Sequence, residues 1–174
     1  MPSILFFLEG NDDERFFTRV IAPPLESQNY TVRIWKYARE KRKRTIQLLK
    51  SVQGAGMAYV FVRDIDDAPS VQAKKEEMIR CFEVVSDGDI VVVVMEIESW
   101  YLAGARPALL KRIGAEGYGD TDYITKEQFN QLIPRPMSRI VFMQEILKHF
   151  DLEGAKEKNA SFRYFMRRWI ERSC

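Results

Sequence analysis

The sequence predicts an α/β fold with a mostly parallel sheet of about four strands, flanked by helices and followed by a C-terminal helical segment. Short apolar runs, rich in β-branched and aromatic residues, occur at residues 4–8, 30–37, 59–62 and 90–95. Each of the first three runs is followed by a segment whose apolar residues recur at helical spacing. Because apolar runs of this kind are typical of strands covered on both faces, we expect parallel strands joined by right-handed crossovers.

Length and composition indicate one folded domain. The chain has 174 residues, of which 46% are hydrophobic and 30% charged, and a net charge of +2. This near balance of charge argues against a protein that coats nucleic acid with its whole surface. We expect a single domain over residues 1–174, in which an α/β core at 3–103 carries a mainly helical extension at 104–174.

Several classes of protein are excluded by what the sequence lacks. The N-terminus has no basic region and cleavage site of a secretory signal, and the longest apolar run is too short to cross a membrane. The two cysteines, Cys81 and Cys174, have no metal-site partners at useful spacing, so we expect free thiols in a reducing, cytoplasmic compartment without membrane contact. His149 is the only histidine, which leaves almost nothing for a histidine-based metal site or triad.

The first strand ends at Glu9 and a glycine, and residues 11–13 offer N-cap and acidic groups for a helix. Apolar residues between 16 and 21 follow at helical spacing. We expect this helix to end near Pro23, because proline interrupts helical hydrogen bonding. A strand, a tight turn and a helix in this order are the opening of an α/β unit.

The second strand is followed by a basic run at residues 39–44, which contains five cations, and then by a helix at 45–52. The run has two interpretations, a patch that contacts phosphates and a solvated helix face. Cations at a helix N-terminus oppose the helix dipole and therefore cost stability, which slightly favours a functional role.

The third strand, at 59–62, runs into Asp64 and Asp66, and a helix at 70–82 follows, with Lys74 among the residues expected to face water. If strand geometry persists to Asp66, both aspartates leave the same face of the sheet. Paired carboxylates suit Mg²⁺ or Mn²⁺. The alternative is that both are strand-end and helix-cap residues. Arg63 should point away from both aspartates.

The fourth strand ends in Glu96 and Glu98, again two residues apart. Acidic residues thus follow three of the four predicted strands. Because ligands of open parallel sheets bind outside the carboxyl ends of the strands, this coincidence favours a divalent cation site there. The residues that this argument brings together are Glu9, Asp64, Asp66, Glu96 and Glu98.

Helices are predicted beyond residue 105 at 125–132, 138–150 and 161–170. The last carries an apolar stripe typical of a helix packed on a core, and arginines on its other side. These arginines, which include Arg163, Arg167 and Arg168, suit either a solvated face or phosphate contacts.

The spacing from Leu8 to Phe17, with Glu9-Gly10 and Asp13, followed by a strand ending Asp64-x-Asp66, resembles the Toprim fold over about residues 3–103. That domain is shared by topoisomerases, primases and the nucleases of the overcoming-lysogenization-defect family. The chain is most similar to small stand-alone Toprim-like proteins, which also carry a Glu-x-Glu-x-Trp-x-Leu-Ala segment, here at 96–103, and a late Ser-Phe-x-x-Phe, here at 161–165.

The resemblance implies a Mg²⁺- or Mn²⁺-dependent phosphoryl-transfer enzyme, most naturally a nuclease, with Glu9, Asp64 and Asp66 as catalytic carboxylates. The metal ligands that it implies are Glu9, Asp13, Asp64, Asp66, Glu96 and Glu98. It also leaves open a non-catalytic module that binds metal or nucleotide and works with a partner ATPase. A sugar-nucleotide transferase is a third alternative, since Asp-x-Asp binds metal-diphosphates there, but Glu9-Gly10 fits it poorly.

Overall fold

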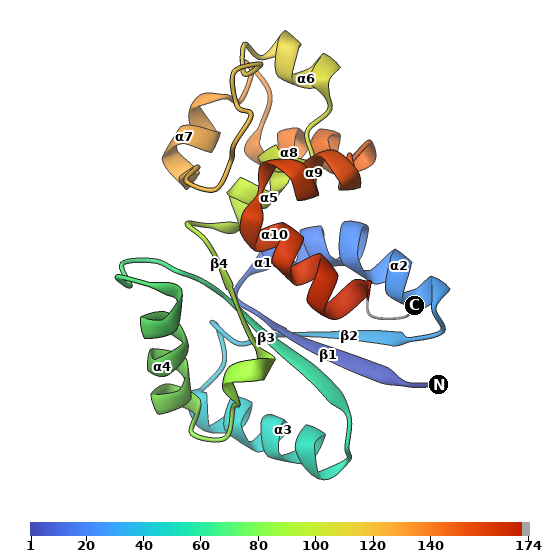
Figure 1. Ribbon diagram of the computed structural model, residues 1–174, viewed down its shortest axis with the longest axis vertical. Helices are drawn as coiled ribbons and strands as arrows, with labels where there is room; N and C mark the ends of the chain where they lie inside the picture. Colours follow the sequence, from blue (N-terminus) through green and yellow to red (C-terminus); the bar gives the residue numbers. More distant parts are fainter. Residues whose placement is uncertain (172–174) are drawn as a thin grey trace. The chain divides into compact units, whose positions relative to one another are not determined.

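The computed structural model describes residues 1–171, which form two compact units (Figure 1). Unit 1 is Met1–Val93, and unit 2 begins at Val94. Among the described residues, no helix combines the length and the apolar composition that a membrane span requires. Cys81 is a free thiol, as expected, and Cys174 lies outside the described residues.

Unit 1 is built on a four-stranded, all-parallel sheet in the order β2-β1-β3-β4. The predicted parallel α/β fold is therefore confirmed. β1 and β3 pair at the centre, with Phe7 opposite Phe61. The strands are β1 (Ser3–Leu8), β2 (Thr31–Lys36), β3 (Ala58–Asp64) and β4 (Ile90–Val93).

Helices cover both faces of this sheet (Figure 1). On one face, Phe7 and Phe61 stack with ring centroids 4.9 Å apart, and the Phe61 ring also contacts Phe82 of α4. On the other face, Phe6 packs against Phe17, with centroids 5.0 Å apart. The helices are α1 (Asn11–Phe16), α2 (Ala22–Ser27), α3 (Arg42–Gly54) and α4 (Val71–Phe82), with short helical turns η1 (Phe17–Ile21) and η2 (Asp87–Asp89).

The helix expected to end near Pro23 continues to Ser27, so that prediction is wrong. A π-helical turn, η1, separates α1 from α2 and leaves Pro23 and Pro24 in the first turn of α2. Proline has no N–H to donate, and the π-helical turn before it already departs from the hydrogen bonds of a regular α-helix.

Unit 2 is helical. Three of its segments, α7, α8 and α10 with η3, occupy the positions of the three predicted helices. α6 and α9, of six and seven residues, were not predicted. The elements are α5 (Ile97–Ala103), α6 (Pro107–Arg112), α7 (Lys126–Gln131), α8 (Arg139–Lys148), α9 (Leu152–Lys158), α10 (Ala160–Phe165) and the π-helical turn η3 (Met166–Ile170).

The core of unit 2 gathers around Trp100 of α5. Its ring packs on Phe162 and Phe165 of α10, with centroids 5.2 and 5.4 Å away. Its indole N–H donates to Ser161 Oγ at 2.8 Å, and Asn159 Oδ1 accepts hydrogen bonds from Ser161 Oγ and the Phe162 N–H. Because a buried indole N–H needs an acceptor, this hydrogen bond fixes how α10 lies on α5.

We expect Gly104→Ala to destabilise unit 2. A β-carbon on Gly104, the residue that ends α5, would lie 2.1 Å from Cε2 of Phe150. Since the Phe150 ring, which packs on Phe162, would have to move, the substitution should cost about 1–3 kcal/mol of unfolding free energy, as overpacking does. Urea unfolding of the two proteins measures the difference.

Gly117→Ala is the matched control, because nothing lies within 4 Å of a β-carbon at Gly117. It should leave the unfolding midpoint unchanged or raise it slightly. Equal midpoints for Gly104→Ala and Gly117→Ala would contradict the close contact between Gly104 and Phe150.

Candidate functional site

The carboxyl edge of the unit 1 sheet contains a topological switch point. From β1 the chain crosses to β2 on one side, whereas from β3 it crosses to β4 on the other, so the direction of winding reverses between β1 and β3. Open α/β sheets bind ligands in the crevice at this point. Glu9 directly follows β1 and Asp64 is the last residue of β3, so both lie at the switch point.

Asp66 does not continue the strand. β3 ends at Asp64, and Asp66 has a φ of +49°, in the left-handed region. The expectation that both aspartates leave one face is therefore wrong, because the alternation of side chains ends with the strand. The turn directs the Asp66 carboxylate onto two cations, Lys74 Nζ at 2.7 Å and an Arg63 Nη at 3.3 Å.

Arg63 also departs from expectation, because its side chain points toward Asp66 and not away from it. Its Nε lies 3.6 Å from Glu9 Oε2, and the guanidinium stands over the Tyr37 ring, 5.9 Å from the centroid. Burial would lower the pKa of Arg63, but its electrostatic contacts with Tyr37, Glu9 and Asp66 outweigh this effect and raise that pKa. Arg63 thus links the end of β1 to the turn after β3.

The Tyr37 ring packs against the Arg63 guanidinium. This ring is buried beside Phe61, and the Tyr37 hydroxyl donates to the carbonyl oxygen of Val62 at 3.1 Å. Burial raises the pKa of the Tyr37 hydroxyl well above its ordinary value, and the charges of Glu9 and Asp13 act in the same direction. The phenol therefore stays neutral and serves as a fixed platform for Arg63.

Lys74 is the functional candidate that sequence reasoning missed. It was expected to face water, yet only 3% of it is exposed, and its ammonium group contacts Asp66 and also Glu77, 3.4 Å away. A sequence signal exists, because Lys74 lies four and eight residues before Met78 and Phe82, the other buried residues of α4. Placing a lysine in that apolar stripe puts its charge at the carboxyl edge of the sheet.

These charges border a pocket of 620 Å³ in unit 1. Side chains of both signs of charge line it, so the pocket suits a polar ligand better than an apolar one. The charged residues in its lining are Arg63, Asp66, Asp67, Lys74, Glu77 and Arg80.

Asp13 and Glu9 play different parts at the end of β1. Asp13 is buried and its Oδ2 accepts the Gly10 N–H at 3.1 Å, so it stabilises the start of α1. The N-cap residue is Gly10, one position before the predicted 11–13. Glu9 Oε2 is shielded from water and accepts no hydrogen bond within residues 1–171; its nearest cation is Arg63.

Glu96 and Glu98 belong to unit 2. β4 ends at Val93, and Glu96 is the N-cap of α5, with Oε2 accepting the Lys126 N–H at 2.5 Å. Glu98 lies inside α5, is buried, and forms an ion pair with Arg139 of α8. The predicted position of both glutamates at a strand end is therefore wrong: the strand is two residues shorter than its apolar run, and each carboxylate holds unit 2 together.

No group of three or more histidine, cysteine, aspartate or glutamate side chains is arranged to hold a metal in the part of the chain that the structure describes. Of the predicted ligands, Glu9 and Asp64 lie at the ends of adjacent strands, and Arg63 connects Glu9 to Asp66. Hard carboxylate oxygens suit Mg²⁺, which commonly takes only one or two carboxylates and keeps several waters. Glu9 and Asp64 supply the oxygen type and the number of carboxylates that such an ion takes from a protein.

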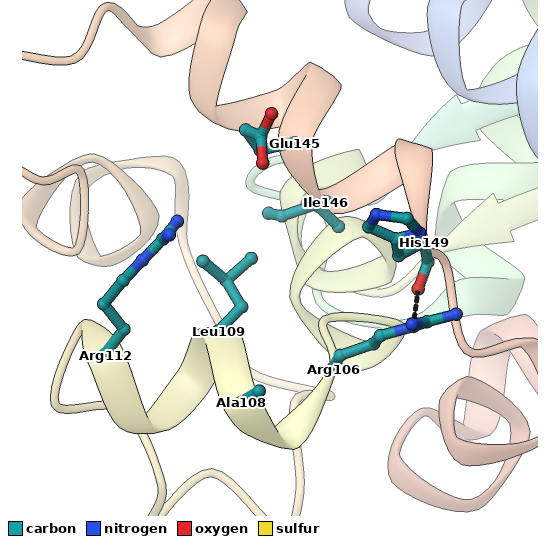
Figure 2. A pocket seen from close by; sticks show the side chains of 7 residues that line it. All are labelled: Arg106, Ala108, Leu109, Arg112, Glu145, Ile146 and His149. Atoms are coloured by element: carbon teal, nitrogen blue, oxygen red, sulfur yellow. Dashed lines mark hydrogen bonds between the residues drawn. The ribbon is translucent and has the colours of Figure 1, made fainter.

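A second pocket, of 230 Å³, lies between α6 and α8 of unit 2 (Figure 2). Arg106 Nε donates to the carbonyl oxygen of His149 at 2.8 Å, and Leu109 and Ile146 form its apolar side. His149, the residue that ends α8, contributes its backbone to this contact, in keeping with a structural role. None of the predicted site residues lines this pocket.

The chain was compared with protein-family models, with curated proteins and with solved structures, and none of them matches it.

We expect the stability of unit 2 to depend on pH through Glu98. Burial raises the pKa of this carboxyl above its ordinary value of 4.5, against the opposing effect of the Arg139 hydrogen bond. Between 4.5 and the raised pKa, the unfolded chain has lost a proton that the folded protein keeps, so stability falls as pH rises through this range. Urea midpoints of the wild type and Glu98→Gln, measured from about pH 4 upward, test this.

The decrease of the urea midpoint with rising pH should be smaller in Glu98→Gln, because this variant has no titrating group at position 98. Glu116→Gln, an exposed glutamate of the same unit, is the control and should follow the wild type. Identical pH profiles for all three proteins would show that Glu98 does not titrate in this way.

Proposed function

We propose that this protein is a divalent-metal-dependent phosphoryl-transfer enzyme that hydrolyses phosphodiester bonds, with its active site at the switch point between β1 and β3. The observation that carries the proposal is the Glu9 carboxylate, which lies beside the end of β3 with one oxygen buried and without a hydrogen bond among the described residues. Its ion pair with Arg63, at 3.6 Å, is longer than a hydrogen bond, and a divalent ion would supply a direct ligand contact to this oxygen.

The charge balance of the carboxyl edge supports the same proposal. At this edge and in the pocket lining, carboxylates outnumber cations: Glu9, Asp13, Asp64, Asp66, Asp67 and Glu77 stand against Arg63, Lys74 and Arg80. A divalent ion would reduce this excess of negative charge. Glu9 and Asp64 would hold it, because Asp13 caps α1 and Asp66 is engaged by both cations. Mg²⁺ bound there would polarise the phosphodiester and lower the pKa of a bound water.

Arg63 and Lys74 would act on the substrate. Both cations are largely withdrawn from water, and both line the pocket formed by the loop between β3 and α4 and the first turns of α4. Fixed cations in such a place stabilise the negative charge that develops on a phosphate, because they need no reorganisation. Arg63 is held by Tyr37 and Glu9, and Lys74 by Asp66, so neither must be ordered when substrate binds.

The basic run would position the substrate backbone. α3 runs back from the end of β2, so its N-terminus and the run at 39–44 lie at the same carboxyl edge as Glu9 and Asp64. Of the run, Arg39, Lys41, Arg42 and Lys43 are exposed without a described partner, and only Arg44 is paired, with Glu40 at 2.9 Å.

A second candidate is a non-catalytic module that binds metal or nucleotide and works with a partner ATPase. It is favoured by the engagement of Asp66, whose carboxylate already contacts Arg63 and Lys74. In this function the pocket beside Lys74 would receive nucleotide phosphates, and no water would be activated for attack.

We expect cleavage that requires Mg²⁺ or Mn²⁺, stops with a chelator, and is lost in Glu9→Gln and Asp64→Asn. Both substitutions keep the shape of the side chain and remove the charge that holds the ion. Plasmid, single-stranded DNA and RNA serve as substrates, with circular dichroism as the check that each variant folds.

Glu76→Gln, an exposed glutamate on α4, is the control for loss of a carboxylate and should cleave like the wild type. If none of the three substrates is cut with either metal, by the protein alone or with a partner ATPase, the binding module replaces the enzyme.

We further expect the double variant Lys41→Glu, Lys43→Glu to bind nucleic acid more weakly and with less dependence on salt. Each phosphate contact that is lost should reduce the slope of log affinity against log salt by about 0.7 to 0.9. The same change should stabilise α3, because acidic residues favour a helix N-terminus. Anisotropy titrations of a labelled duplex across a salt series measure the slope.

Lys50→Glu changes the charge of α3 away from its N-terminus and is the control, since Lys50 is also exposed. An equal slope for the wild type and the double variant would identify the basic run as a solvated face.

A further inference from the structure

Unit 2 exposes a second basic surface, which the proposed active site does not use. Ala160, Arg163, Tyr164, Arg167 and Arg168 of α10 and η3 line a hollow of 450 Å³. Their spacing of three, four, seven and eight residues places them along one side of the helical segment. We call this set the arginine–tyrosine stripe.

The direction of the stripe is fixed by the core. Phe162, Phe165, Met166 and Ile170 are buried on the other side of the segment, where two of them contact Trp100. Asn159 caps the start of α10. Because the apolar side cannot rotate out of the core, the stripe must face outward.

The stripe is positively charged. No acidic residue occurs between 159 and 170, and Arg167 is exposed, with no hydrogen bond or ion pair among the described residues. Of the acidic residues beside the segment, Glu153 and Glu171 both contact Lys156, at 2.7 Å, and Asp122 Oδ1 accepts the Ala160 N–H at 2.6 Å. Arginines four residues apart, as Arg163 and Arg167 are, repel each other on a helix, and a polyanion would remove that cost.

Tyr164 lies among these arginines with 52% of its surface exposed. An accessible aromatic ring between cations combines the two elements of single-strand recognition, a face on which a base can stack and charges that follow the phosphate backbone. In a duplex the bases are already stacked, so an exposed ring would contribute little to binding.

We infer that the arginine–tyrosine stripe binds single-stranded nucleic acid, with Tyr164 stacking on one base and Arg167 contacting a backbone phosphate. Arg163 Nη1 donates to the Lys156 carbonyl oxygen at 2.7 Å, and Arg168 stands over the Trp169 ring, so both guanidinium groups are already positioned. The inference does not require catalysis, since every residue of the stripe lies in unit 2 and outside the proposed active site.

The test is an anisotropy titration of the full chain with labelled single strands of about 12 nucleotides, one of DNA and one of RNA, and with the matched DNA duplex. Chelator is present throughout, so neither metal nor cleavage takes part. Tyr164→Ala should weaken single-strand binding by about 5- to 100-fold, whereas Tyr164→Phe should bind like the wild type. Arg167→Gln should reduce the salt slope for single strands by about 0.7.

Two matched variants serve as controls. Tyr123→Ala removes a tyrosine that is 74% exposed but lies next to Asp122, and Arg112→Gln removes an exposed arginine outside the stripe. Both should bind single strands like the wild type. DNA and RNA strands that bind alike identify the backbone and base faces as the common ligand, and a preference for one of them identifies its sugar as a further contact.

Three results would overturn the inference: no single-strand binding by the wild type, unchanged binding by Tyr164→Ala, or a duplex that binds as tightly as the single strand. Single-strand binding without cleavage by any metal would leave the stripe in place and remove the proposed enzyme. If the wild type cleaves nucleic acid and Tyr164→Ala binds single strands normally, the proposed enzyme stands and the role of the stripe is rejected.

Discussion

The pairing of β1 with β3 at the centre of a parallel sheet is the constraint on which the carboxyl edge of unit 1 depends. β1 leads outward to β2 and β3 leads outward to β4, so the chain turns away in both directions beyond the carboxyl ends of the two central strands. The stacked rings of Phe7 and Phe61, with Tyr37 and Phe82 around them, fix these strands in register. That register places Glu9 and Asp64 at the carboxyl ends of adjacent strands.

The charges at this edge are arranged around two cations that are largely withdrawn from water. A buried lysine is costly unless it is paired, and Lys74 meets this requirement through Asp66 and Glu77. Arg63 uses its planar group to contact Glu9 and Asp66 while its face lies over Tyr37. Cations that are largely withdrawn from water favour the binding of an anion. Phosphate is an anion that arginine and lysine side chains both bind well.

The segments at residues 96–103 and 161–165 contact each other. Trp100 of the first segment donates to Ser161 of the second, and its ring packs on Phe162 and Phe165. The Glu98 carboxylate forms an ion pair with Arg139. These residues therefore build the core of unit 2, and the same packing turns the arginine–tyrosine stripe to the surface.

The sequence by itself determined the parallel α/β sheet and the position of Glu9 and Asp64 at its carboxyl edge, because apolar runs and helical periods are local properties of the chain. The direction of the Asp66 side chain was decided by a left-handed residue in the turn after β3. The packing of α4 decided the burial of Lys74. The contacts of Arg63 depend on Glu9, Tyr37 and Asp66, which follow β1, β2 and β3. Such contacts join residues distant in the chain, so only the tertiary structure could place them.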